Sequence, residues 1–538
     1  MTETILLKHP LLGSIVGRRK GQVAQFLGIK YGSLKHRFAT SEVAIPGNSD
    51  PFTTATNYGP PVVSPPESCD MEMSFIQQSL EKPTIPPMSD LEGLNLNITL
   101  PLVDGQLPSL HTNRGLPVLV YVHGGGFFFG SNSYPHYDQA RIAEQGMRDG
   151  CPFIAMNINY RLGAPGFLTS REIRNAGCPT NNGLRDQQTA FRWVKKYISG
   201  FGGDPDAITA IGQSAGAASL TYHLHSPEPF FNRCVLLAGT SLMMRPVDAD
   251  TAESVYEVVL KALGLDQLAP QDRFDALLKT DFTEFVQKLG PIPALCPVVD
   301  HDLIPGVPSF DRIANDGDLP LPGRKWCQSL MSVDCECDGS IFALVNLNPR
   351  ERGIRKAFQD SIRSSLGENR SKALIDFYKI TDGTPDSTAL RLITDFISDV
   401  MFFAPSIAFA NAWDMSFVGH FNEGNPWEGL YQDRANHMLD IAYLWQNFND
   451  KFTLQQEAVS TTFARDVVAF TASLDRLPPF KSERKVTVYG PSRAGITSDV
   501  KDVDDEATGR KYKKFFKMAD EVGGLDAVLD AAGTFLMG

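Results

Sequence analysis

Short apolar runs alternate with amphipathic stretches along most of the chain. From residue 94 onward, the runs are rich in Val, Ile and Leu and are bounded by Gly or Pro, a pattern typical of strands covered on both faces. They occupy residues 117–123, 151–159, 207–212, 234–237, 332–337 and 416–421. Between two of them, residues 183–200 place Leu184, Phe191 and Val194 on one side of a helix. This alternation predicts an α/β fold with a mostly parallel central sheet wrapped by helices.

Two long segments break the alternation. Residues from about 250 to 290 and from 351 to 412 carry helical patterns without a strand between them. We interpret both as helical insertions that could cap an active site. The length of 538 residues leaves one domain or two open, because large α/β domains often exceed the average domain size.

Composition and charge restrict the possible partners. Apolar residues make up 42% of the chain and charged residues 21%, which excludes a disordered or fibrous protein. The net charge of −12 gives no general attraction to phosphate backbones or anionic lipid, so we expect neither nucleic acid nor a membrane as partner. The longest apolar stretches, residues 115–130 and 234–244, are too short or too glycine-rich to span a bilayer. The oligomeric state stays unknown at this stage.

The cysteines and the amino terminus bear on the compartment. Eight cysteines are a sparse count, and residues 1–13 lack the features of a secretory signal, so we expect a reducing, cytoplasmic setting. Cys335 and Cys337 form a CxC pair, but no second cluster has zinc-like spacing, and no metal site is predicted.

The first chemical signal is Gly-Gln-Ser-Ala-Gly at residues 212–216. It follows the strand-like residues 207–211 and precedes a helix-forming run. A serine on such a sharp turn needs glycine two places before and after it, because a β-carbon there would collide with the backbone. An ordinary glycine-rich turn is the alternative, but the strand and helix on either side favour Ser214 as a nucleophile.

The second signal is His-Gly-Gly-Gly at residues 123–126, directly after an apolar strand and before three phenylalanines. Consecutive glycines let backbone N–H groups point to one place, where they can hold the negative oxygen of a tetrahedral intermediate. A flexible loop is the alternative, although flexible loops rarely lie between a buried strand and three aromatic residues.

Successive motifs resemble landmarks of the type-B carboxylesterase and cholinesterase family. In chain order they are residues 26–32 (FLGIKYG), 91–96, the HGGG segment, 159–163 (NYRLG), 182–187 (NGLRDQ) and 201–205 (FGGDP). The resemblance extends from about residue 10 to residue 480. It implies the α/β-hydrolase fold, a single catalytic domain over residues 1–538, a Ser-acid-His triad and no metal or cofactor. It also implies that the N–H groups of Gly125, Gly126 and Ala215 form the oxyanion hole.

Chain order narrows the choice of histidine. In α/β-hydrolases the serine is followed by the acid and then by the histidine. Only His420 and His437 follow a suitable acid, and His420 lies in an alternating strand-like stretch where a structural role is more typical. We therefore favour His437, which stands in a loop before an apolar helical pattern. The family's spacing of a histidine and an acid three places later resembles His437 and Asp440.

The acid is not decided by pattern alone. Asp334, Glu336 and Asp338 alternate, so a continuing strand would place all three on one face. The resemblance selects Asp338, because an acid followed by Gly-Ser and then Phe matches residues 338–342. The family more often has glutamate at this position. A solvated carboxylate at a strand end is the alternative for Asp338.

Other positions bear on specificity. Gln213 stands where the family commonly has glutamate, which removes a negative charge and disfavours a cationic, choline-type substrate. Ala238 stands where many members place a serine, so hydroxyl support of the triad must come from elsewhere. We predict a largely apolar substrate pocket lined by Phe127, Phe128, Gln213, Phe402 and Phe403.

Together these features predict a serine hydrolase that cleaves carboxylic esters of small, largely apolar molecules through an acyl-enzyme. Two alternatives remain. The same acyl-enzyme could pass its acyl group to another nucleophile, giving acyl transfer or lactone formation or opening in secondary metabolism. A non-catalytic adhesion or binding protein on the same fold is less favoured, because serine, acid and histidine are all retained.

Overall fold

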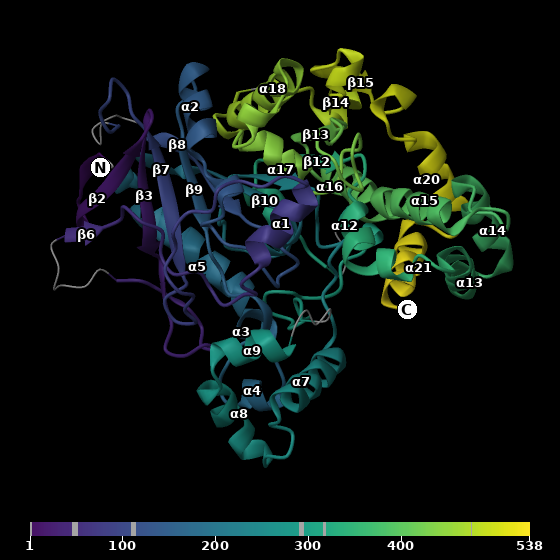
Figure 1. The fold of residues 1–538 in the computed structure, drawn as a ribbon, viewed down its shortest axis with the longest axis horizontal. Coiled ribbons are helices and arrows are strands. Elements are labelled where there is room, and N and C mark those ends of the chain that lie inside the picture. The colour runs from purple at the N-terminus through teal and green to yellow at the C-terminus, as the bar shows by residue number, and fades with distance from the viewer. Residues whose placement is uncertain (1–2, 46–51, 109–114, 290–294, 316–318, 475) are drawn as a thin grey trace.

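The computed structural model describes residues 3–45, 52–108, 115–289, 295–315, 319–474 and 476–538. Within these ranges, one 13-stranded sheet runs through the molecule (Figure 1). Its order is β1 (Thr4–His9), β2 (Gly13–Lys20), β3 (Val23–Lys30), β7 (Asn95–Pro101), β9 (Ile154–Ile158), β8 (Leu116–Val122), β10 (Gly203–Gln213), β11 (Arg233–Leu237), β12 (Ser329–Cys335), β13 (Ser416–Phe421), β14 (Lys485–Tyr489) and β15 (Ser498–Asp502), with β6 (Phe52–Thr54) beside β2. A separate pair joins β4 (Gly32–Ser33) to β5 (Glu42–Val43).

The middle of the sheet is parallel. Every neighbouring pair from β9 through β14 runs in the same direction. The amino-terminal strands and β15 pair antiparallel, except that β6 runs parallel to β2. The six predicted strands correspond to β8, β9, β10, β11, β12 and β13. Parallel strands end at a common edge, so the segments that follow β8, β10, β12 and β13 come together there.

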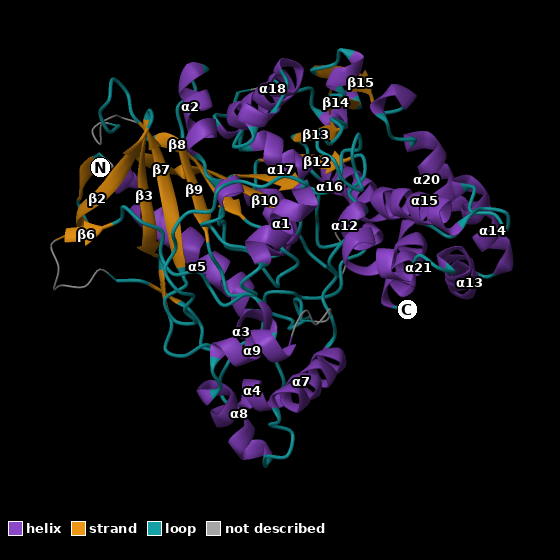
Figure 2. Ribbon diagram, in the orientation of Figure 1, coloured by secondary structure: helices purple, strands orange, loops and turns teal. Residues whose placement is uncertain are grey.

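Helices cover both faces of the sheet (Figure 2). Val118, Val120 and Val122 of β8 share one core with α5 (Asn182–Tyr197), α6 (Ala215–His223) and α16 (Ala404–Ala412). Leu119 and Tyr121 of the same strand share the opposite core with α2 (Ala140–Arg148), α17 (Leu439–Leu444) and α18 (Leu454–Thr471). Burial on both faces explains the nearly uninterrupted apolar sequence of this strand.

Helices occupy both segments that we interpret as insertions, although residue 290 lies outside the described residues. The first contains α7 (Ala249–Leu263), α8 (Pro270–Lys279) and α9 (Phe282–Leu289), which gather with α4 (Arg171–Asn175) in a lobe below the sheet (Figure 1). The second contains α13 (Ile354–Leu366), α14 (Glu368–Tyr378), α15 (Asp386–Ser398) and α16, and it lies beside the carboxyl-terminal helices α20 (Tyr512–Glu521) and α21 (Leu525–Met537). The remaining helices are α1 (Ser68–Ile76), α3 (Gly163–Phe167), α10 (Phe310–Ala314), α11 (Gly323–Trp326), α12 (Ser340–Phe342) and α19 (Phe480–Glu483).

Among the described residues, Asp386–Ala412 forms one continuous helical stretch that is long and apolar enough to cross a membrane. An 18-residue window within this stretch has a mean hydropathy of 1.5, and 78% of the window is buried inside the protein, so the stretch packs as a core helix. The sequence predicted helices over residues 351–412, but this stretch was not counted among the longest apolar runs because Arg391, Asp395 and Asp399 interrupt it.

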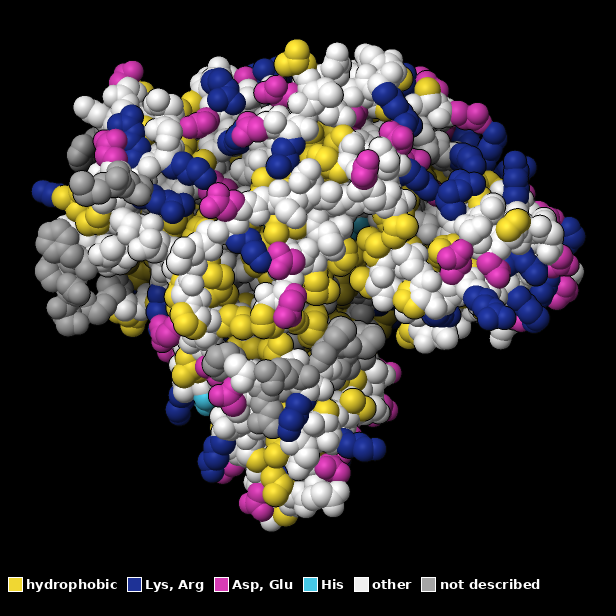
Figure 3. All heavy atoms as spheres, in the orientation of Figure 1, with side chains coloured by type: hydrophobic (Ala, Val, Ile, Leu, Met, Phe, Trp, Pro, Cys, Tyr) yellow, Lys and Arg dark blue, Asp and Glu magenta, His cyan; other side chains and the backbone are white. Residues whose placement is uncertain are grey.

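The surface mixes charges of both signs, and apolar side chains gather in the middle of the face seen in Figure 3, above the lobe. The described residues contain no cluster of three or more His, Cys, Asp or Glu side chains that could hold a metal ion.

Candidate active site

Ser214 occupies the sharp turn between β10 and α6. Its backbone angles are φ 54° and ψ −121°, a conformation that L-residues rarely adopt. The Ser214 N–H donates to the carbonyl of Leu237 at 2.9 Å, and the Ser214 carbonyl accepts from Ala218 at 2.9 Å, so β11 and α6 both hold the turn. The Ser214 side chain is 9% exposed, which leaves its hydroxyl within reach of a small molecule.

No residue larger than glycine fits at the positions two before and two after the serine. A β-carbon on Gly212 would collide with the backbone of Gly216, and one on Gly216 would collide with the carbonyl of Val122. The close packing of β8, β10 and α6 at this point therefore explains the pattern that singled out Ser214 in the sequence.

The HGGG segment follows β8 and lies against the serine turn. A β-carbon on Gly124 would lie 3.1 Å from the Cβ of Ser214, which places the two loops in contact. The carbonyl of Gly125 accepts from Phe128 at 2.9 Å and from Phe129 at 3.0 Å. Among the described residues, the N–H groups of Gly125, Gly126 and Ala215 have no acceptor, and Ala215 is the first residue of α6.

His437 and Asp338 lie together at the same edge of the sheet. His437 Nδ1 lies 2.8 Å from Asp338 Oδ1, and the His437 N–H donates to the hydroxyl of Ser340 at 2.9 Å. The other ring nitrogen, Nε2, lies 3.1 Å from the side-chain amide nitrogen of Gln213, the residue before Ser214. The imidazole therefore lies next to the serine turn and is oriented by a carboxylate from the other side.

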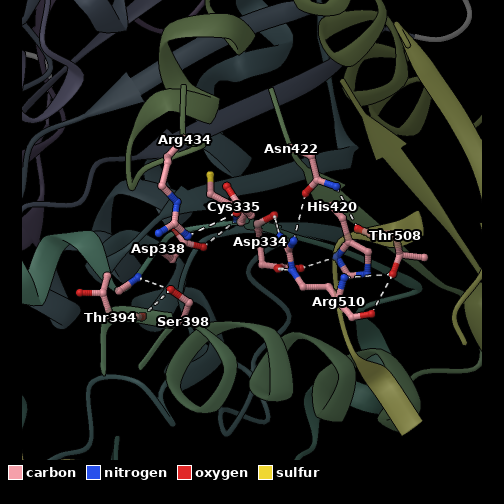
Figure 4. Close-up of polar contacts among 12 residues, drawn as sticks. Asp334, Cys335, Asp338, Thr394, Ser398, His420, Asn422, Arg434, Thr508 and Arg510 are labelled. Carbon is pink, nitrogen blue, oxygen red and sulfur yellow. Dashed lines mark hydrogen bonds and ion pairs between the residues drawn. The ribbon is translucent and has the colours of Figure 1, made fainter. Parts of the chain in front are cut away.

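The turn that carries Asp338 is held at several points (Figure 4). Asp338 Oδ2 accepts the N–H of Cys335 at 2.7 Å. The Gly339 N–H donates to the hydroxyl of Ser398 at 2.9 Å, and that hydroxyl donates to the carbonyl of Thr394 at 2.9 Å. The core helix α15 thus fixes the position of the acid, and Ser340 supplies a hydroxyl to the histidine loop.

Comparison with known proteins shows the family to which the chain belongs. A sequence model of the carboxylesterase family matches residues 4–478. The chain belongs to the carboxylesterase family. It is 27% identical over 455 residues to the para-nitrobenzyl esterase of Bacillus subtilis, covering 81% of this chain and 82% of that protein. It is also 27% identical over 406 residues to a secreted triacylglycerol lipase of Gibberella zeae, covering 70% of this chain and 66% of the lipase.

Solved structures confirm the predicted fold of this carboxylesterase. A PNB esterase superposes with a TM-score of 0.72 at 22% sequence identity, covering 95% of this chain and 99% of that protein. The predicted α/β-hydrolase architecture is therefore confirmed. Esterase and lipase relatives support ester hydrolysis by a serine hydrolase and give no support to acyl transfer or to a non-catalytic adhesion role.

The three acids of the 334–338 segment do not share a face in the carboxylesterase. The strand β12 ends at Cys335, and the chain then turns, so the alternation expected from the sequence stops after Asp334. Asp334 contacts His420 at 2.6 Å and Arg510 at 2.6 Å, whereas Glu336 contacts Arg434 at 3.3 Å. Asp338 alone reaches His437.

Burial acts to raise the pKa of three acids near the site, but the net shift of the pKa differs between them. It raises the pKa of Asp338, and the hydrogen bond with His437 offsets only part of that rise. Burial alone would also raise the pKa of Asp334, but Arg510 and His420 outweigh it, and the net shift of that pKa is downward. Burial and the nearby Asp338 raise the pKa of Asp440 to about 7.

The predicted pocket residues separate into two groups. The Phe402 ring lies 5.4 Å from the His437 ring, Phe128 is half-buried beside the glycine loop, and Gln213 touches His437. Phe127 instead packs in the core at 4.8 Å from Phe167. Phe403 packs against His420 and the carboxyl-terminal helix α20, because successive positions of the helical turn at 399–403 point to different sides. We therefore leave Phe127 and Phe403 out of the pocket.

Sequence reasoning missed two features of the site. The contact between Gln213 and His437 joins residues 224 positions apart. The sequence marked Gln213 as a departure from the family and as a pocket residue, but not as a partner of His437. The pairing of Asp334 with Arg510 spans 176 positions and has no local signal at all.

Proposed function

We propose that this carboxylesterase hydrolyses esters of small, largely apolar molecules, with Ser214 as nucleophile, His437 as base and Asp338 as the acid that orients it. The observation that carries the proposal is the imidazole bonded to Asp338 at 2.8 Å and seated against the residue before Ser214. An imidazole whose Nδ1–H is held by a carboxylate presents its Nε2 lone pair to a proton donor, which is the tautomer that a general base needs.

The reaction follows from these roles. The Ser214 oxygen attacks the ester carbonyl carbon while its proton passes to His437 Nε2. The N–H groups of Gly125, Gly126 and Ala215 receive the negative oxygen of the tetrahedral intermediate. The alcohol leaves with the proton from His437, and an acyl-enzyme remains. A water molecule then gives its proton to His437 and attacks the acyl carbon, and the acid is released as Ser214 regains its proton.

The preference for apolar substrates rests on the surroundings of the triad. Phe402 faces His437, Phe128 flanks the glycine loop, and Gln213 carries no charge. A cationic substrate would find no carboxylate at the position of Gln213. Comparing kcat/KM for p-nitrophenyl acetate, butyrate and octanoate with that for a choline ester tests this preference, and a faster choline ester would contradict it.

Labelling with a fluorophosphonate tests the nucleophile. We expect one modified peptide that contains Ser214, and no label on Ser214→Ala. The matched control is Ser219→Ala in the same helix, because the Ser219 hydroxyl donates to the Ala215 carbonyl and faces α5 rather than the turn. A label retained by Ser214→Ala would overturn the assignment.

We also propose a reducing, cytoplasmic setting for the enzyme. In its support, all eight cysteines are free, and the sulfur atoms of Cys234 and Cys327 lie 3.9 Å apart without a disulfide bond between them. The Gibberella relative is described as secreted, so fractionation of cells that express the untagged protein is the deciding measurement.

A further inference from the structure

The lone pair of the base is occupied in the substrate-free structure. His437 Nε2 lies 3.1 Å from the Gln213 amide nitrogen, and the Ser214 hydroxyl forms no hydrogen bond with any described residue. Both Gln213 and His437 are buried, with 0% and 2% of their surfaces exposed. The group that touches the base is therefore not the nucleophile but the side chain of its chain neighbour.

The direction of this hydrogen bond follows from the tautomer. Because Nδ1 carries the proton donated to Asp338, Nε2 of the neutral ring can only accept. The amide nitrogen of Gln213 must then donate, since the opposite orientation would place an amide oxygen against a lone pair. The bond exists only while the imidazole is neutral, because a protonated Nε2 has no lone pair to offer.

Within the part of the chain that the structure describes, the side-chain amide of Gln213 forms a hydrogen bond through its nitrogen but not through its oxygen. Its oxygen, Oε1, is buried without a hydrogen-bond partner among the described residues. It faces the glycine loop, where a β-carbon on Gly124 would lie 2.6 Å from it, so the absence of a side chain at this glycine makes room for the amide. A side chain held by a single hydrogen bond can leave that bond at modest cost.

We propose that Gln213 is a positioning residue that caps His437 Nε2 in the free enzyme and must release it before Ser214 can be activated. This inference rests on the proposed function, because it assigns a resting state to the same base. Gln213, which stands where the family commonly has glutamate, would then compete with the Ser214 hydroxyl for the lone pair of His437 Nε2.

Capping has a characteristic dependence on pH. In alkaline solution the neutral base divides between capped and free forms, and only the free form accelerates acylation. A protonated ring has no lone pair at Nε2, so the cap does not form on it and capping has no effect on kcat/KM once the ring is protonated. Removing the cap should therefore raise kcat/KM where the ring is neutral and leave it unchanged where the ring is protonated.

Other charged groups near the imidazole ring would not produce the same pH dependence of the kcat/KM ratio. Asp338 bonds the ring from the loop after β12, and Asp440 approaches from α17 with its pKa raised to about 7. Gln213 itself comes from β10, Phe402 contributes no charge, and Ser340 supplies a neutral hydroxyl. Because both acids are present in every variant, their titration largely cancels in the ratio of variant to wild type.

The test compares Gln213→Met with the wild type, using p-nitrophenyl acetate from pH 5 to pH 9. Methionine keeps the length of the side chain and removes the N–H donor. We expect the ratio of kcat/KM to be near one in acid and to rise to roughly 2- to 10-fold in base, the range that one ordinary hydrogen bond allows. The acid side of the profile of kcat/KM against pH should shift to higher pH by the base-10 logarithm of the same factor. A ratio that does not vary with pH, or a slower variant in base, would overturn the proposal.

Two further variants complete the experiment. Gln213→Glu keeps the shape of the side chain but has no N–H donor when its carboxyl group is ionised. The ratio of its kcat/KM to that of the wild type should therefore also rise with pH, from below one in acid to above one in base. The control is Gln187→Met, because Gln187 bonds His223 at 2.8 Å in a buried pair away from the triad. It should lower the melting temperature and leave the shape of the pH profile unchanged.

The proposed function is measured separately from the cap. Ser214→Ala should abolish turnover whichever way the Gln213 ratio turns out. Activity that persists in Ser214→Ala would reject the proposed nucleophile, whereas loss of that activity together with a flat Gln213 ratio would reject only the cap.

Discussion

At the scale of single residues, the site combines strain with buried charge. Ser214 could be proposed as the nucleophile from the sequence because glycine is sterically required two places before and after it, and His437 as the base because few histidines follow a suitable acid. Asp338 needed the family resemblance, since the pattern alone treated Asp334, Glu336 and Asp338 alike. The structure separates these acids by the partner that each one meets, which local sequence does not encode.

The backbone strain at Ser214 predicts a gain in stability when its β-carbon is removed. A residue held at φ 54° costs on the order of 1–3 kcal/mol, and glycine adopts this conformation freely. Ser214→Gly should therefore be about 1 kcal/mol more stable than Ser214→Ala once the greater chain entropy of unfolded glycine is allowed for. Urea unfolding of the two inactive variants measures the difference, and equal midpoints would show that the turn is not strained.

Asp338→Asn should separate activity from stability. An asparagine favours the wrong tautomer of His437, so kcat should fall by about 10³- to 10⁴-fold. A carboxyl whose pKa is raised on folding costs stability at neutral pH, so removing its charge should leave the melting temperature equal or higher. Asp334→Asn is the control: the pKa of Asp334 is lowered on folding, so that variant should be less stable instead. Similar losses of stability in both variants would contradict the argument.

At the scale of elements, the loops at the edge of the sheet decide the chemistry. The apolar runs predicted the six central strands, because strands buried on both faces cannot tolerate polar residues. Their ends were less predictable: β12 stops at Cys335 since Asp338 turns back to accept the Cys335 N–H. That turn is fixed by contacts with α15, which is distant in sequence.

The glycine loop allows a matched pair of substitutions. A β-carbon on Gly125 would collide with the carbonyl of Phe129, whereas one on Gly126 would meet open space. Gly126→Ala should therefore cost only the strain of its positive φ, roughly 1–2 kcal/mol, and reduce kcat by crowding the oxyanion site. Gly125→Ala should lower stability by a larger amount. Thermal unfolding and kcat measured on both variants check this order, and a reversed order would contradict the placement of the loop.

At the scale of the whole molecule, the carboxyl-terminal segment beyond residue 478 is tied to the central sheet. Arg510 inserts between Asp334 of β12 and Asn422, which follows β13, and all of these contacts are buried or half-buried (Figure 4). Sequence analysis gave the segment no role, because an ion pair between residues 334 and 510 leaves no periodic trace in either region. The fold as a whole was predictable from the alternation of strands and helices, whereas the contacts of Arg510 with Asp334 and Asn422 were not.

Arg510→Met should destabilise the protein strongly. It leaves Asp334 buried without its guanidinium partner, a loss of about 3–5 kcal/mol. The lowered pKa of Asp334 means that this stabilisation is present above its unfolded value near 4 and is lost as the pH falls below it, so the variant and the wild type should converge in acid. Urea unfolding at pH 7 and at about pH 2.5 provides the measurement. Lys513→Met, which breaks an exposed ion pair with Asp504, should change little.

The lobe of α4, α7, α8 and α9 packs around a small hydrophobic cluster of its own, separate from the two large cores that enclose the sheet. Such a cluster gives its helices less cooperative support than the sheet receives. Backbone amides of α7 and α8 should therefore take up deuterium well before those of β8 and β10. The lobe can then open locally while the sheet edge that carries the proposed active site keeps its shape.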